Sequence, residues 1–101
     1  MELTERATEI REHFTSVYAD DLTERLNQAA ESGTLDEHLN GDFVCAEDLE
    51  GADDLARQTV AQNFGWHTED ADMVAALEQP GCYAAVNFTG IIDTARKLNA
   101  R

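Results

Sequence analysis

The segment LTERATEIREHFTSV at residues 3–17 decides the fold class, because apolar side chains recur in it at every third or fourth position. These side chains belong to Leu3, Ala7, Ile10, Phe14 and Val17. The spacing places them on one face of an α-helix. Thr4 is suited to cap the start of this helix, and Glu5 follows near the positive end of the helix dipole. The segment therefore predicts an amphipathic helix that packs through one apolar face.

A second helical stripe follows on a shifted face of the same stretch. Its apolar members are Tyr18, Leu22, Leu26 and Ala29. The change of face predicts a break or bend near Asp20 and Asp21, where Asp21 and Glu24 form a helix-start signal. Gly33 is placed to end the second helix. We therefore expect two consecutive helices before Gly33, separated at the two aspartates.

The middle of the chain predicts a short helix, a connection and a longer helix. Thr34 and Glu37 form a capping box that opens the short helix, and Gly41 ends it. Residues 42–52 are expected to form an irregular, acidic connection. A helix from about residue 54 to residue 64 follows, because its apolar positions return to helical spacing.

Two more helices are predicted after Gly65. Thr68 caps the first, which runs to about residue 79 and stops at Pro80-Gly81. Its inward side chains are expected to be Ala71, Val74 and Leu77. The last helix is predicted by the spacing of Ala84, Phe88, Ile91, Ala95 and Leu98, although a strand over residues 82–88 stays open. The whole chain thus predicts one all-α domain, residues 1–101, built as a small bundle of about five helices.

The chain is strongly acidic, with 21 Asp and Glu against 7 Lys and Arg and a formal net charge of −14 at pH 7. The charge gathers in a central stretch that contains no Lys or Arg. Its eight carboxylates are Asp36, Glu37, Asp42, Glu47, Asp48, Glu50, Asp53 and Asp54. Such a surface repels nucleic acids and anionic membranes and attracts basic proteins. We therefore expect a basic protein surface as the partner, with no direct binding of nucleic acid or membrane.

A second acidic feature lies on the first helix. Glu2, Glu5, Glu9 and Glu12 fall on one edge of it, and successive members are separated by about 4.5 to 6 Å of helix rise. Phosphates along one strand of duplex DNA advance about 3.4 Å each. A helix edge of this kind can imitate a strand of nucleic acid. The competing interpretation is an exposed polar helix face without a partner.

The segment around residues 55–78 resembles the helix-turn-helix of DNA-binding regulators. The resemblance rests on small residues and apolar positions, namely Ala61, Gly65, Ala71, Val60, Phe64, Trp66 and Val74. It implies a helix pair whose second member would enter the major groove. That member opens with residues 68–72, whose three carboxylates would meet the DNA phosphates. We therefore expect the helix pair as a feature of the fold, without DNA binding as its function. A helix-turn-helix-like regulator stays open as a second alternative function.

Signals for catalysis and metal binding are absent from the sequence. His13, His38 and His67 have acidic neighbours but no metal-ligand spacing such as H-E-x-x-H. The acidic stretch lacks the ligand positions of a calcium loop. Cys45 is surrounded by acids, which raise the pKa of a thiol and oppose its use as a nucleophile. We expect neither an enzyme nor a metal or other cofactor.

Three features of the sequence predict the compartment. The first residues carry three glutamates and lack the apolar core of a signal peptide. The longest uncharged run, residues 79–92, is 14 residues long and is interrupted by Pro80 and Gly81, so it is too short to cross a bilayer. Two cysteines, Cys45 and Cys82, are expected to be reduced and buried. We therefore expect a cytoplasmic protein.

These features favour a non-enzymatic inhibitor that occupies a basic, nucleic-acid-binding site on a protein partner. Phage-encoded anti-restriction and anti-CRISPR proteins that act as DNA mimics are similar in size, in acidity and in lack of chemistry. On this hypothesis residues 36–54 pair with Arg and Lys of the partner, the Glu2–Glu12 row extends the contact, and Phe43 or Leu49 supplies an apolar anchor. The first alternative is a small helical adaptor whose acidity serves solubility or salt adaptation.

Overall fold

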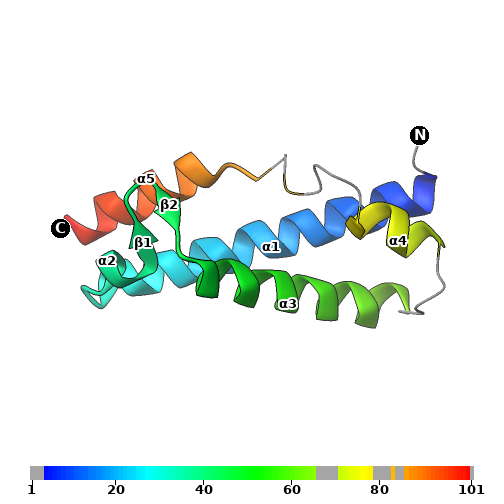
Figure 1. Cartoon of the computed structure of the whole chain (residues 1–101), viewed down its shortest axis with the longest axis horizontal. Coiled ribbons are helices and arrows are strands. Elements are labelled where there is room, and N and C mark those ends of the chain that lie inside the picture. The colour runs from blue at the N-terminus through cyan, green and yellow to red at the C-terminus, as the bar shows by residue number, and fades with distance from the viewer. Residues whose placement is uncertain (1–3, 66–70, 79–82, 84–85, 101) are drawn as a thin grey trace.

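The computed structural model describes residues 4–65, 71–78, 83 and 86–100. Within these residues the fold is an all-α bundle of five helices, as predicted, with one short pair of strands (Figure 1). The molecule is elongated, with extents of 46 × 24 × 18 Å. None of the described helices is long and apolar enough to cross a membrane.

The longest helix, α1 (Glu5–Glu31), runs along the length of the molecule and forms the centre of the core (Figure 1). Three helices pack against it: α3 (Ala46–Phe64), α4 (Ala71–Glu78) and α5 (Phe88–Asn99). α4 lies near the N-terminal end of α1, and α5 lies near its C-terminal end (Figure 1). Each of these helices is therefore anchored to α1.

The predicted break at Asp20 and Asp21 is wrong, because α1 is one continuous helix of 27 residues. Asp21 accepts a hydrogen bond from Nε of Arg25, one turn further on, at 2.6 Å. It therefore acts as a partner inside the helix and not as a start signal. The apolar stripe shifts for another reason. The buried side of α1 turns along its length, and α4 packs near the N-terminal end of α1 whereas α5 packs near its C-terminal end (Figure 1).

Both ends of α1 follow their sequence signals. Thr4 caps the start, since its side-chain oxygen accepts from the amide of Ala7 at 3.0 Å. Gly33 follows the end of the helix with a φ of 75°, a conformation that favours glycine. The amide of Thr34 donates to the carbonyl of Ala29 at 2.8 Å, which satisfies a free carbonyl at the helix end.

The predicted irregular connection over residues 42–52 is wrong. A hairpin of β1 (Leu39–Asn40) and β2 (Phe43–Val44) follows the one-turn helix α2 (Leu35–His38). Leu39 pairs with Val44, and Asn40 pairs with Phe43, in antiparallel register. Gly41 has a φ of 66° and begins the two-residue turn. It therefore serves the hairpin, while α2 already ends at His38.

α3 begins at Ala46, well before the predicted start near residue 54. Sequence reasoning missed the first two turns because their side chains are mostly acidic. Ala52, Ala56 and Val60 nevertheless form one buried face, which also includes Asp48. The helix ends at Phe64, and Gly65 follows with a φ of 70°, as its sequence signal predicted.

The inward face of α4 differs from the prediction. Leu77 is buried as expected, but Ala71 and Val74 are exposed. Met73 and Ala76 take their place in the core. The rotation agrees with a contact at the start of α4, where the hydroxyl of Thr4 donates to Asp72 at 2.6 Å. The predicted cap at Thr68 and the stop at Pro80-Gly81 lie outside the described residues.

α5 begins at Phe88, where the side chain of Asn87 caps it by accepting from the amide of Gly90 at 2.9 Å. Val86 and Asn87 are neither helix nor strand, and residues 82, 84 and 85 lie outside the described part. Ile92 and Ala95 form the buried positions of the helix, and Phe88, Ile91 and Leu98 are half-buried beside them. The predicted last helix is thus shorter at its start.

Candidate functional site

The eight carboxylates of the central stretch occupy different environments. Six are exposed, namely Asp36, Glu37, Asp42, Glu47, Glu50 and Asp54. Of these, Asp42 lies 3.3 Å from a guanidinium nitrogen of Arg96. The other two have partners inside the protein, since Asp48 is buried and Asp53 is half-buried. The acidic stretch is thus continuous in sequence, but in the folded chain only part of its carboxylates is exposed to solvent and free of a described ion-pair partner.

Asp48 is the buried member of a partly buried polar cluster at the start of α3. Its Oδ2 lies 2.8 Å from Nδ1 of His38, and the thiol of Cys45 donates to the same oxygen at 2.8 Å. This hydrogen bond to Asp48, together with burial, raises the pKa of the Cys45 thiol. A raised pKa disfavours the thiolate, so Cys45 is poorly suited to act as a nucleophile. The free thiol is half-buried.

Asp53 connects α3 to the segment around Tyr83. One carboxylate oxygen accepts from the hydroxyl of Tyr83, and the other accepts from Nε of Arg57 at 2.8 Å. Arg57 also lies over the ring of Phe14, 5.6 Å from its centroid. Burial lowers the pKa of Arg57, but the hydrogen bond and the charge of Asp53 outweigh this effect and raise it. Both carboxylate oxygens of Asp53 are therefore occupied by hydrogen bonds within the protein.

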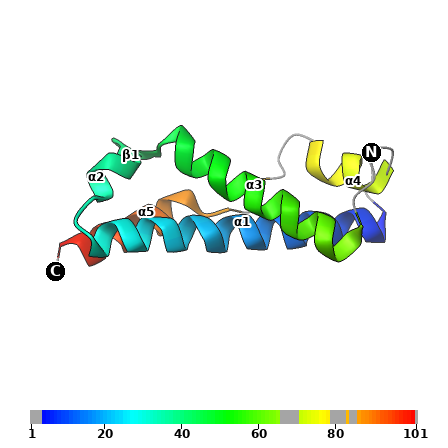
Figure 2. The ribbon, with the colours of Figure 1, turned by 90° about the horizontal axis from the view of Figure 1, so that it is seen from below.

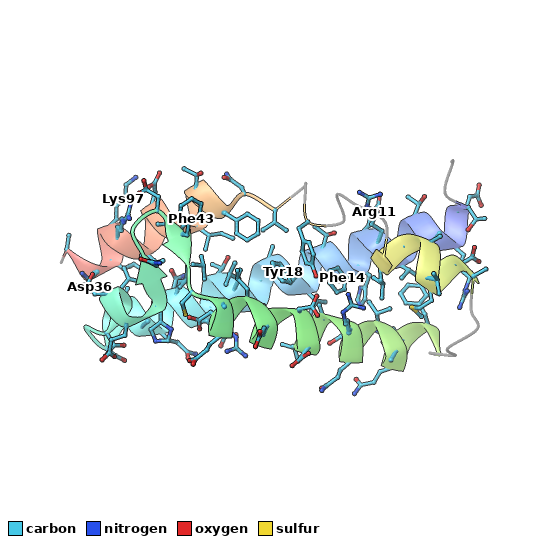
Figure 3. All side chains as sticks on the ribbon, in the orientation of Figure 1. Arg11, Phe14, Tyr18, Asp36, Phe43 and Lys97 are labelled. Carbon is cyan, nitrogen blue, oxygen red and sulfur yellow. The ribbon has the colours of Figure 1, made fainter. Side chains whose placement is uncertain are left out.

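The exposed acids of α3 form a short ridge. Glu47, Glu50 and Asp54 are spaced by three and four residues, which places them on one side of the helix over about 10 Å. Their side of α3 is opposite to the buried one. Figure 3 places Asp36 of α2 at the same end of the molecule as Lys97 of α5, so that end carries both signs of charge.

The first helix carries a longer acidic row than the sequence suggested. Glu5, Glu9 and Glu12 are exposed as predicted, and Glu2 lies outside the described residues. Because α1 does not break, the row continues, and its members, which we call the α1 row, are Glu5, Glu9, Glu12, Asp20, Glu24 and Glu31. All six are exposed, and they lie within about 120° of arc over about 39 Å of helix.

The positive charges of α1 have partners of their own. Arg6 borders the α1 row, but its guanidinium lies 3.4 Å from Asp72 and donates to the carbonyl of Phe64 at 3.2 Å. Arg25 pairs with Asp21. All six members of the α1 row are acidic, and the Arg6 guanidinium that borders the row is paired with Asp72. Sequence reasoning missed its second half because it placed a helix break at Asp20.

The α1 row and the α3 ridge project from different sides of the molecule. Each lies on the side of its helix that faces away from the buried residues. Figure 2 shows α2, α4 and the start of α3 on one side of α1, while the end of α3 crosses in front of α1. The two acidic surfaces are therefore separate, and the α1 row is the longer one.

The described residues offer no metal centre. They contain no group of three or more His, Cys, Asp or Glu side chains arranged to hold an ion. Nε2 of His13 lies 2.8 Å from the side-chain nitrogen of Asn63, His38 contacts Asp48, and His67 lies outside the described part. The turn of the helix-turn-helix-like segment, residues 66–70, is also outside it, so that pair stays a prediction.

Comparisons of the chain with protein-family models, with curated proteins and with solved structures give no match.

Proposed function

We propose that this protein is a non-enzymatic inhibitor that occupies a basic, nucleic-acid-binding site on a protein partner. The α1 row carries the proposal. Six exposed carboxylates follow one side of a continuous helix for about 39 Å. A DNA strand of this length holds about twice as many phosphates. The row therefore presents about half the charge of one strand, in a line of similar length.

The packing of α1 supports this role. Its opposite side is held by buried residues from Ala7 to Ala30, so the helix that displays the acids is fixed along its whole length. A surface that is rigid before binding loses less conformational entropy when a partner docks. Carboxylates on such a surface would pair with the Lys and Arg side chains that a partner uses for phosphates. Proteins of the anti-restriction and anti-CRISPR kind from phages act on such partners.

The acids on the outer side of α3 favour one alternative. Because exposed carboxylates lie on two sides of the molecule, its acidity also suits a small helical adaptor that is adapted to salt. The two functions predict opposite responses to salt. Binding by an inhibitor weakens as salt rises past about 0.5 M, where charges are screened within a few ångströms. A salt-adapted fold unfolds at low salt and gains stability at high salt.

Displacement of DNA tests the proposal. Fluorescent duplex DNA is bound to each of several nucleic-acid-binding enzymes, including a restriction endonuclease and an RNA-guided nuclease, and its anisotropy is followed as the protein is added. We expect displacement from at least one enzyme at micromolar protein or below. The variant Glu9→Gln/Glu12→Gln/Glu24→Gln should raise the protein concentration that displaces half of the DNA, which we call the midpoint, by about tenfold or more.

A charge-matched variant provides the control. Asp36→Asn/Glu37→Gln/Asp93→Asn removes three exposed carboxylates outside the α1 row. Although Asp36 and Glu37 are themselves candidate contacts, this variant should raise the midpoint clearly less than the α1-row variant does. Equal losses in both variants would mean that only total charge matters. No displacement from any enzyme at micromolar protein would refute the inhibitor.

A further inference from the structure

The space between α3 and α5 forms a groove whose floor includes Tyr18 of α1. Two hollows follow one another along it, with volumes of about 450 Å³ and 340 Å³. Both are lined by Leu49 of α3 and Phe88 of α5, so the two hollows are adjacent. We call the pair of hollows the groove. Figure 1 shows α3 and α5 on either side of α1, with the hairpin of β1 and β2 at one end.

An exposed aromatic ring stands at the hairpin end of the groove. Phe43 is 75% exposed, the most exposed large apolar side chain of the described residues. Alternation along β2 explains this position, because Val44 points into the core and Phe43 therefore points away from it. Phe43 lines the second hollow together with Ile92. Figure 3 shows its side chain beside α5. An exposed aromatic beside an apolar groove is typical of a protein-binding surface.

The border of the groove is acidic. Glu50, Asp53 and Asp54 line the hollow nearer to Tyr18, and Asp42 lines the hollow nearer to Phe43. Arg57 is the one basic residue among the described lining residues of the two hollows, and it is paired with Asp53. Asp42 is paired with Arg96 in the same way, so the net negative charge of the border comes from Glu50 and Asp54. A second copy of the chain carries the same border and a net charge of −14, which opposes self-association.

We propose that this groove binds a basic, amphipathic helix of the partner protein. Apolar side chains at helical spacing would contact Phe43, Leu49 and Phe88, and flanking Lys or Arg side chains would pair with Glu50 and Asp54. An amphipathic helix laid into an apolar groove is a common mode of peptide recognition. The proposal rests on the proposed function in one respect, namely that the partner is basic. It adds a second contact surface, on a side of the molecule separate from the α1 row.

A designed peptide tests this proposal. The probe is a fluorescent 18-residue helix with leucines on one face and lysines on the other, and its controls are a scrambled peptide and one with glutamate in place of lysine. Anisotropy titration measures the dissociation constants. We expect saturable binding of the amphipathic basic peptide alone. Equal binding of the scrambled peptide would overturn the proposal, because charge without an apolar face would then suffice.

Matched variants locate the binding surface. Phe43→Ala should weaken peptide binding by roughly tenfold to thirtyfold, as truncation of an aromatic anchor does at interfaces. Leu55→Ala shortens a partly exposed apolar side chain of α3 that does not line the groove and should leave binding unchanged. Glu50→Gln/Asp54→Asn should weaken it, whereas Glu9→Gln/Glu12→Gln on the α1 row should have less effect. An unchanged affinity in Phe43→Ala would contradict the assignment.

Two further outcomes separate the possible failures. If the peptide binds through Phe43 but no enzyme releases its DNA, the groove assignment stands and the inhibitor function is wrong. If DNA is released and the peptide does not bind, the inhibitor function stands and the groove assignment is wrong. Sedimentation at the concentration of the peptide assay gives the oligomeric state. A dimer that Phe43→Ala dissociates would assign the groove to a second copy and overturn the proposal.

Discussion

Nδ1 of His38 lies 2.8 Å from Oδ2 of Asp48, and this contact joins the end of α2 to the first turn of α3. The hairpin of β1 and β2 lies between the two residues in the chain. The thiol of Cys45, the N-cap residue of α3, donates to the same oxygen of Asp48. One buried carboxylate therefore holds together the segment that sequence reasoning took for an irregular connection.

Removal of this carboxylate should destabilise the protein. We expect Asp48→Ala to lower the free energy of unfolding by about 1–3 kcal/mol, because His38 and Cys45 would both lose their acceptor. Urea denaturation followed by circular dichroism measures the change. Glu47→Ala, at the exposed neighbouring position, should stay within about 0.5 kcal/mol of the unmodified protein. Equal stability of the two variants would show that the cluster does not hold the segment.

The thiol of Cys45 should react more slowly with an alkylating reagent in the folded protein than in the unfolded chain. Its pKa is raised, chiefly by the hydrogen bond to Asp48, so at a given pH it forms less thiolate than a free cysteine. In a Cys82→Ser background, alkylation of the folded protein by iodoacetamide at pH 8 should be slower than alkylation in urea. Asp48→Asn removes the negative charge and should speed the reaction. A folded thiol that reacts as fast as the unfolded one would contradict this.

The same shift predicts a small dependence of stability on pH. Because the pKa of Cys45 is higher in the folded state, the thiol contributes its full stabilisation below the unfolded pKa of about 8.5. This contribution is lost as pH rises through the folded pKa. The free energy of unfolding should therefore fall less steeply above pH 8.5 in Cys45→Ala than in the unmodified protein, which urea titrations at several pH values measure. Identical slopes would argue against it.

The helices of this chain were largely predictable from the sequence because their ends carry local signals. Thr4, Gly33 and Gly65 mark helix ends through their own capping or backbone conformation, and a single sequence contains that information. The break at Asp20 was predicted from a shift of the apolar stripe. The shift arises from contacts with α4 and α5, which are distant in sequence and follow no local pattern.

The candidate surfaces were less predictable for a related reason. A run of acids such as residues 36–54 does not reveal which carboxylates are buried, since Asp48 and Asp53 find partners in His38 and Tyr83 only in the folded chain. The α1 row could have been extended at helical spacing beyond Glu12, had the helix been continued. The groove beside Phe43 depends on the separation of α3 and α5, which no local pattern in the sequence predicts.

The hydrogen bond between Tyr83 and Asp53 should contribute to stability. Tyr83→Phe keeps the ring contacts with Tyr18 and Phe14 but removes the hydroxyl that donates to Asp53. We expect a loss of about 0.5–1.5 kcal/mol in the free energy of unfolding. Asp53→Ala should cost more, since it also leaves the half-buried Arg57 without this partner. Urea denaturation of both variants and of their double mutant measures the coupling, and a coupling of zero would contradict the link.

A glycine inside α3 offers a change that should stabilise the protein. A Cβ on Gly51 would lie 2.7 Å from the end of the Arg25 side chain, which can move away because it is flexible. Moving it weakens the pair of Arg25 with Asp21, an i,i+4 pair that contributes about 0.5 kcal/mol. Alanine is favoured over glycine inside a helix by about 1 kcal/mol.

The gain in helix propensity should therefore exceed the loss of the ion pair. We expect Gly51→Ala to raise the free energy of unfolding by about 0.5 kcal/mol, and by more at high salt, where the Arg25–Asp21 pair is already screened. Arg25→Ala in both backgrounds is the control, because without this side chain Gly51→Ala should give the full propensity gain. A destabilised Gly51→Ala that Arg25→Ala does not rescue would place a second obstacle beside Gly51, and the predicted accommodation would be wrong.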